Sequence, residues 1–181
     1  MLGGWASFLG WTVLEWILNH PTTQIHVKEL ARQLHVSPLT ANTYLKAYRN
    51  DGILFEEKKG NAQFYQLVDS PVTRHLKSAF TLRILERKAF VRAVLEENPQ
   101  ATSIVLYGTR ANGTYDEQSD YDVLVFSQNP AFPKKAVHVL EKEANLRVLG
   151  LNQYRKLNEA FRKSIENNHV ILYGSGLVNK A

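Results

Sequence analysis

The chain has 181 residues, of which 44% are hydrophobic and 22% charged, and this composition excludes an intrinsically disordered protein. Cysteine is absent, which excludes disulfides and thiolate metal sites and fits a reducing cytoplasm, where we expect the protein to be. Lysine and arginine outnumber aspartate and glutamate, 22 to 17, so the formal net charge is +5. A basic balance is compatible with nucleic-acid binding but is weak evidence for it.

The first predicted helix covers residues 7–19, and the "NHP" stretch ends it. Its apolar residues recur at helical spacing: Phe8, Val13, Leu14, Trp16 and Ile17. The apolar start of the chain raises the question of a signal peptide or a membrane span. It has no basic flank, Glu15 interrupts it, and it is too short to cross a bilayer. We therefore expect a buried amphipathic helix and no membrane partner.

Two more helices are predicted to follow. Residues 26–36 carry one apolar face, with Val27, Leu30, Ala31 and Leu34. The third helix is expected to begin with Ser37 as its N-cap and Pro38 as its first residue, where a missing N–H costs nothing. Its inward-facing residues are expected to be Ala41, Tyr44, Leu45 and Tyr48.

A hairpin is predicted after the third helix. Residues 53–67 show two strand patterns joined at Gly60-Asn61, a pair suited to the positive backbone angles of a tight turn. Three helices followed by a two-stranded hairpin is the element order of a winged helix-turn-helix. We therefore expect residues 1–69 to form a DNA-binding domain of this type.

A helix-turn-helix consists of two helices, and the second of them, which is the third helix of this chain, enters the major groove of DNA. The hairpin that follows, called the wing, contacts phosphates. The predicted contacts to double-stranded DNA are the outward side chains of the third helix and two wing lysines: Thr40, Asn42, Thr43, Lys46, Lys58 and Lys59. Glu56 and Glu57 in the wing argue mildly against DNA, because they repel phosphate. The pattern leaves open an ordinary solvated face or a protein-docking module.

The stretch "VKELARQLHVSPLTANTYLKAYRNDGIL" resembles the winged-helix repressor families of prokaryotes. The resemblance covers about residues 10–68 and includes a small residue, Ala31, that lets two helices approach closely. It implies DNA binding and transcription regulation. It also makes a homodimer plausible, because repressors of this kind read symmetric sites.

Residues 70–98 form a long helical stretch that mixes apolar and basic side chains. We expect connector helices here, and a candidate dimer surface. Residues 99–181 then alternate strand and helix, with strands predicted at "SIVLY", "YDVLVF" and "LRVLGL", a short helix near Arg110, and helices over 133–144 and 153–167. This order predicts a small mixed sheet with helices packed on it, so the fold class of the whole chain is α+β.

The stretch "VLYGTRANGTYDEQSDYDVLVF" carries the main candidate site. Residues two apart on a strand face the same side, so Asp120 and Asp122 present their carboxylates together, and Mg²⁺ is the natural cation between them. Gly108 and Thr109 form a turn between a buried strand and a helix start, where backbone N–H groups and a hydroxyl can hold phosphate oxygens. The sequence therefore predicts a site for phosphate and metal.

This stretch is similar to the signature of the minimal nucleotidyltransferases of the DNA polymerase beta superfamily, over about residues 100–173. That family usually has serine where this chain has Thr109. The resemblance implies a nucleoside triphosphate as substrate or ligand and a catalytic, Mg²⁺-binding pair of carboxylates. The implied site residues are Asp120 and Asp122 for metal and catalysis, and Gly108, Thr109 and Arg110 for the nucleotide.

The family uses a third acidic residue on a neighbouring strand, and this chain has no acid in the strand "NLRVLGL". Arg147 is expected at that place, where its guanidinium can pair with either aspartate and supply the charge of a metal ion. Glu141 and Glu143 would take the place of the third acidic residue only if the register of this strand differed by several residues. An outward-facing Arg147 is the other alternative.

Two functions follow from these patterns. The first is Mg²⁺-dependent transfer of a nucleotidyl group to an acceptor hydroxyl, which the resemblance extends to an acceptor on a partner protein or a toxin-like partner. The second is a DNA-bound regulator whose transferase fold is degenerate and serves nucleotide sensing or protein contact. The acidic pair favours the first function and Arg147 favours the second, because activity depends on the site rather than on the fold.

Overall fold

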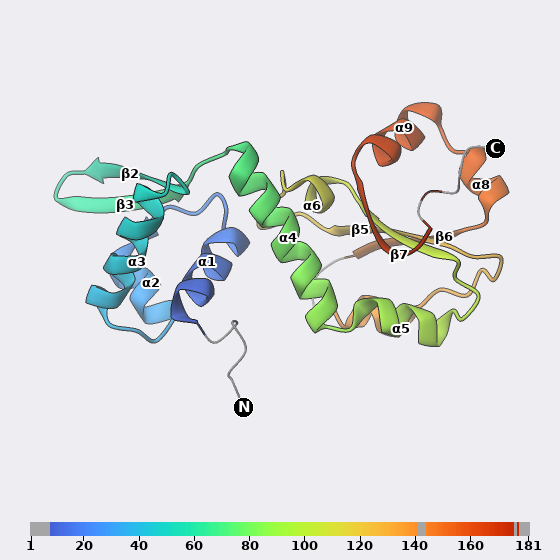
Figure 1. Cartoon of the computed structure of the whole chain (residues 1–181), viewed down its shortest axis with the longest axis horizontal. Helices are drawn as coiled ribbons and strands as arrows, with labels where there is room; N and C mark the ends of the chain where they lie inside the picture. Colours follow the sequence, from blue (N-terminus) through green and yellow to red (C-terminus); the bar gives the residue numbers. More distant parts are fainter. Residues whose placement is uncertain (1–7, 141–143, 176, 178–181) are drawn as a thin grey trace. The chain divides into compact units, whose positions relative to one another are not determined.

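We describe a computed structural model of the chain for residues 8–140, 144–175 and 177. The chain divides into two compact units, Met1–Lys77 and Ser78–Ala181 (Figure 1). The division falls within one helix, α4 (Pro71–Arg87). Among the described residues, no helix is both long enough and apolar enough to cross a membrane.

In its described residues, 8–77, the first unit contains three complete helices, the beginning of α4 and a small antiparallel sheet of strand order β1-β3-β2. Its elements are α1 (Leu9–Asn19), β1 (Ile25–His26), α2 (Val27–Gln33), α3 (Pro38–Asn50), β2 (Leu54–Lys59) and β3 (Ala62–Leu67). Three helices followed by a hairpin are thus present in the expected order. Residue 7, where the first helix was expected to begin, lies outside the described residues.

Local signals in the sequence fix the ends of these elements. The Ser37 hydroxyl accepts a hydrogen bond from the Thr40 backbone N–H at 3.0 Å, and Pro38 occupies the first turn of α3, as expected. Gly60 turns the hairpin with a φ of 61°, at the first of the two loop positions. The apolar faces of the three helices pack over the sheet, with Val13, Ile17, Leu30, Leu45, Leu54 and Tyr65 buried.

The second unit is a four-stranded sheet of order β6-β5-β4-β7, with helices on both faces. Its remaining elements are α5 (Phe90–Glu97), β4 (Ser103–Tyr107), α6 (Thr109–Asn112), β5 (Tyr121–Phe126), α7 (Lys134–His138), β6 (Ala144–Leu149), α8 (Leu151–Arg155), α9 (Glu159–Asn167) and β7 (His169–Gly174). Strands β5 and β6 are parallel, and the other pairs are antiparallel.

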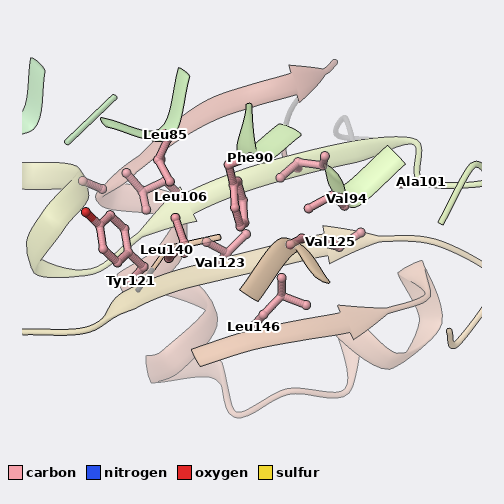
Figure 2. Packing of buried hydrophobic residues seen from close by; sticks show 13 residues of the cluster. Leu85, Phe90, Val94, Ala101, Leu106, Tyr121, Val123, Val125, Leu140 and Leu146 are labelled. Carbon is pink, nitrogen blue, oxygen red and sulfur yellow. The ribbon is translucent and has the colours of Figure 1, made fainter. Parts of the chain in front are cut away.

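Alternation along β4 and β5 divides the apolar residues between two cores. On one face, α4, α5 and α7 cover the sheet, and Figure 2 shows Phe90 and Val94 of α5 close to Leu106, Val123 and Val125. On the other face, α8 and α9 cover Val105, Tyr107, Leu124 and Phe126. The even-numbered positions of β5, including Asp122, therefore face α8 and α9.

Several boundaries differ from the expected ones, including that of α7, which was expected over 133–144 and is observed over Lys134–His138. The stretch 70–98 is not a separate connector, because Leu85, Phe90 and Val94 are buried in the core of the second unit. The expected helix over 153–167 is two helices, α8 and α9. Asn158 separates them and is the N-cap of α9. Its side chain accepts hydrogen bonds from the backbone N–H groups of Ala160 and Phe161.

Candidate functional site

The turn between β4 and α6 lies directly against the acidic strand. Gly108 has φ 75° and ψ −158°, a conformation that L side chains rarely adopt. A Cβ atom at this position would overlap the Asp122 carboxylate and lie 3.2 Å from its Cγ. Glycine is therefore required here for two reasons, its backbone angle and the carboxylate beside it.

The two aspartates share one hydrogen-bond donor. Asn145 Nδ2 donates to Asp120 Oδ2 at 3.1 Å and to Asp122 Oδ1 at 3.2 Å. The parallel pairing of β5 and β6 causes this arrangement, since it places Asn145 directly opposite Asp122. The carboxylates therefore converge, as alternation along the strand predicted, and an amide group links them.

The surroundings of Asp122 oppose its ionisation. Burial raises the pKa of the Asp122 carboxyl above its ordinary value, the hydrogen bond from Asn145 lowers it, and the nearby Asp120 charge raises it further. Arg147 and Arg110 act in the lowering direction. Positive charge close to the pair thus favours the ionised carboxylate, which is the form that binds a cation.

A cavity of about 480 Å³ opens beside Asp122, and Asp120 is not among the residues that line it. Strands β4, β5 and β6 and helices α6 and α9 provide its walls: Tyr107, Gly108, Thr109, Asn112, Asp122, Asn145, Arg147, Phe161, Ser164 and Asn168. Gly108, Thr109 and Asp122 were expected together, and they line one cavity. The far wall, provided by α9, was not expected.

Arg110 lies away from this cavity, although the sequence suggested a nucleotide contact. The residue is only 2% exposed, and its Nε and Nη2 donate to the Ser119 carbonyl at 2.9 and 2.7 Å. The guanidinium also lies over the rings of Tyr115 and Tyr121, 4.6 and 4.3 Å from their centroids. Arg110 therefore holds the segment that leads into Asp120.

Arg147 lies two residues beyond Asn145 on the same face of β6, opposite Leu124. Its guanidinium carbon is 5.2 Å from the centroid of the Phe161 ring. In the described part of the chain, no ion pair joins Arg147 to Asp120 or Asp122. Asn145 thus lies opposite the acidic pair. The sequence had suggested Arg147 for this position, where the family has its third acidic residue.

Several residues of the cavity were missed by the sequence analysis. Asn145 and Arg147 are two residues apart on one strand, so the sequence predicts that both side chains lie on the same face of the sheet. The sequence does not predict which of the two lies opposite the aspartates, because this depends on the register between the strands. Phe161, Ser164 and Asn168 carry no motif and reach the cavity only because α9 packs on the sheet. Glu141 and Glu143 lie outside the described residues.

The donor set fits one Mg²⁺ ion better than two. Among residues 8–140, 144–175 and 177, no group of three or more His, Asp or Glu side chains could hold a metal. Asp120 and Asp122 nevertheless accept hydrogen bonds from the same amide nitrogen, so their carboxylates lie close together and offer oxygen ligands on one side. Mg²⁺ is commonly held by one or two carboxylates together with substrate phosphates and water.

The first unit carries the side chains predicted to contact DNA. Lys46 is exposed on α3, whereas the Thr43 hydroxyl donates to the Leu39 carbonyl at 2.9 Å, and the Thr40 hydroxyl lies 2.8 Å from Ser37 Oγ. Both threonine hydroxyls therefore have partners within their own helix.

A second cavity, of about 560 Å³, lies between the start of α3 and the hairpin. Asn42 and Lys58 both line it. Lys59 instead makes an ion pair with Glu57 at 3.3 Å and donates to Gln24 Oε1 at 2.9 Å. Lys58 and Asn42 thus lie on one surface, and Lys59 is partly neutralised.

Comparison with known proteins finds a family similarity within the second unit. Residues 87–173 match the family model of the nucleotidyltransferase domain. The matched segment is 87 of the 181 residues, slightly less than half of the chain. It contains the turn at Gly108, both aspartates and all of α9. No curated protein matches the chain significantly.

Two solved structures are similar to part of the chain. A toxin–antitoxin crystal structure with AMP-PNP is 18% identical, covers 50% of this chain and 74% of its own, and has a TM-score of 0.40. A crystal structure described as that of a nucleotidyltransferase from Sulfolobus solfataricus is 18% identical, covers 59% of this chain and 92% of its own, and has a TM-score of 0.33. TM-scores this low establish no shared fold.

Proposed function

We propose that the nucleotidyltransferase domain binds a nucleoside triphosphate in the cavity beside Asp122 and transfers its nucleotidyl group to an acceptor hydroxyl. One observation carries this proposal. The Gly108-Thr109 turn and Asp122 line one cavity, and Asn145 in its wall links Asp122 to Asp120, so groups that hold phosphate and groups that hold a cation are adjacent. Phosphoryl transfer needs positioned phosphates and neutralised charge more than covalent help from the protein.

Each residue near the cavity has a role in this proposal. The turn backbone and the Thr109 hydroxyl bind phosphate oxygens, because Thr109 is exposed at the cavity wall. Asp120 and Asp122 hold Mg²⁺, which neutralises phosphate charge when it is bound. Arg147 lies on the same wall and attracts phosphate, while Phe161 offers an aromatic face. Arg110 acts indirectly by holding the segment before Asp120.

The test is a transfer assay with Mg²⁺ and each of the four α-phosphate-labelled nucleoside triphosphates. Acceptors should include the protein itself, nucleic acids and a protein fraction, because the acceptor on a partner protein is part of the proposal. We expect label transfer by the wild type and its loss in Asp120→Asn/Asp122→Asn. Glu159→Gln, an exposed site on α9 outside the cavity, is the matched control and should retain transfer. Equal labelling by the double variant would contradict the proposal.

A second candidate function is nucleotide binding without transfer, and Asn145 favours it. An amide opposite the acidic pair cannot accept the proton of an attacking hydroxyl, as a third carboxylate would. Equilibrium binding of a non-hydrolysable nucleotide separates the two functions. Binding without transfer to any acceptor supports a sensor or a regulatory contact, and absence of binding removes both functions.

We further propose that the first unit is a winged helix that binds double-stranded DNA through α3 and the hairpin. The element order, the exposed Lys46 and the shared surface of Asn42 and Lys58 support this. Affinity for DNA should fall steeply between about 50 and 200 mM salt, because phosphate contacts release counterions. Lys46→Ala/Asn42→Ala should weaken binding, whereas Lys156→Ala in the other unit should not. Unchanged binding in the double variant would remove α3 as the DNA-contacting helix.

A further inference from the structure

Asn145 occupies a position that a cation would suit. Its amide nitrogen lies within hydrogen-bond distance of two carboxylates, and both contacts use the same Nδ2 atom. The amide oxygen cannot take this place, because a carbonyl oxygen facing two carboxylates would be repelled. The N–H groups therefore place positive partial charge between Asp120 and Asp122.

The arrangement also stabilises the two carboxylates in the absence of a metal ion. Two carboxylates a few ångströms apart repel each other unless positive charge lies between them. Asn145 reduces this repulsion with two charge-assisted hydrogen bonds, which are stronger than neutral ones. A cation that binds to both aspartates must first break these bonds or turn the amide over.

Arg147 adds a second obstacle to a free cation. It lines the same cavity, two residues from Asn145 on the same face of β6, so its positive charge repels a free cation there. The same charge attracts an anionic ligand. A nucleoside triphosphate that carries a divalent ion should therefore bind beside Arg147 more favourably than the free ion does.

We propose that Asn145 stands in for the cation in the nucleotide-free protein, so that divalent ions bind weakly alone and enter together with nucleotide phosphates. The inference rests on the proposed function for the nucleotide part only. The amide is a positioning group for the carboxylates, and its replacement by a carboxylate should convert the site into a metal site that needs no nucleotide.

The test is calorimetric titration of the nucleotide-free full chain with Mn²⁺, a spectroscopically visible substitute for Mg²⁺. Asn145→Asp should bind Mn²⁺ roughly tenfold or more tightly than the wild type, because it adds a third carboxylate and removes the competing donor. Asn168→Asp adds the same charge to the same cavity away from the aspartates and is the matched control. Equal affinities for the two variants, or no gain in Asn145→Asp, would overturn the inference.

A second variant keeps the inference testable if three carboxylates prevent folding. Asn145→Ala removes the hydrogen bonds without adding charge, so Mn²⁺ should bind more tightly than to the wild type. Weaker binding would mean that the Asn145 carbonyl is a metal ligand, and the inference would fail. The thermal midpoint with and without Mn²⁺ provides an independent reading, because a bound ion stabilises the folded protein.

The nucleotide part is measured separately with a non-hydrolysable triphosphate analogue. On the wild type, the analogue and Mn²⁺ should each tighten the other's binding by the same factor, about tenfold or more. Independent binding would overturn the coupling. If no nucleotide binds at all, the proposed function fails, while the Mn²⁺ affinities of the Asn145 variants still decide what Asn145 does.

Discussion

Gly108 is the residue at which a single methyl group should disturb both the fold and the site. In Gly108→Ala the new Cβ would have to share the space of the Asp122 carboxylate, and the backbone would have to keep a φ of 75°. The carboxylate must therefore turn away, and its hydrogen bond from Asn145 is lost. We expect the second unit to be destabilised and the acidic pair to separate.

The magnitude follows from these two terms. The backbone conformation of Gly108, with φ 75° and ψ −158°, is almost exclusive to glycine and costs another residue about 1–3 kcal/mol. Loss of one partly exposed hydrogen bond costs about 1 kcal/mol. The free energy of unfolding should therefore fall by about 2–4 kcal/mol. Gly52→Ala is the matched control, because Gly52 has φ +73° with nothing within 4 Å of its Cβ, so only the backbone term applies.

Urea unfolding can be followed separately in the two units. All three tryptophans, at positions 5, 11 and 16, lie in the first unit, so their fluorescence reports Gly52→Ala, while far-ultraviolet circular dichroism also reports the second unit. The decisive measurement is a double-mutant cycle with Asn145→Ala. Gly108→Ala and Asn145→Ala should be non-additive by about 1 kcal/mol, because both act through Asp122. Additive effects would refute the reasoning.

Three further outcomes concern stability. Arg110→Met should lower the free energy of unfolding of the second unit by about 2–4 kcal/mol, since it leaves the Ser119 carbonyl without its two donors; a loss below about 0.5 kcal/mol in urea unfolding would contradict this. Ser37→Ala should cost the first unit about 1 kcal/mol by tryptophan fluorescence, and no change would mean that its hydroxyl does not cap α3. Phe90→Ala should cost about 3–5 kcal/mol by circular dichroism, whereas the half-exposed Phe132→Ala should change stability by less than about 0.5 kcal/mol.

The elements with strong local signals were predictable from the sequence. The start of the third helix was placed correctly at Pro38, because the sequence shows both its N-cap, Ser37, and its first residue. The strands 103–107 and 121–126 were found because each is a short apolar run between turns. The break between α8 and α9 was missed, since it depends on one asparagine side chain that caps the second helix.

Tertiary properties of the site were not predictable in the same way. The choice between Asn145 and Arg147 depends on the register of two parallel strands, which no local pattern encodes. The burial of Arg110 depends on the Ser119 carbonyl and two tyrosine rings that reach it only in the folded domain. A charged residue next to a phosphate-type turn therefore suggested binding, although its side chain supports the loop.

The position of α9 affects how the domain emerges during synthesis. The ribosome releases β4, β5, β6 and α8 before α9, so for a time only α8 can cover the sheet face that carries Val105, Leu124 and Phe126. The edge of β4 is also unpaired until β7 follows. A chain stalled before residue 159 would expose an apolar surface and an unpaired strand edge, both of which promote aggregation. Chaperones would be needed most at this stage.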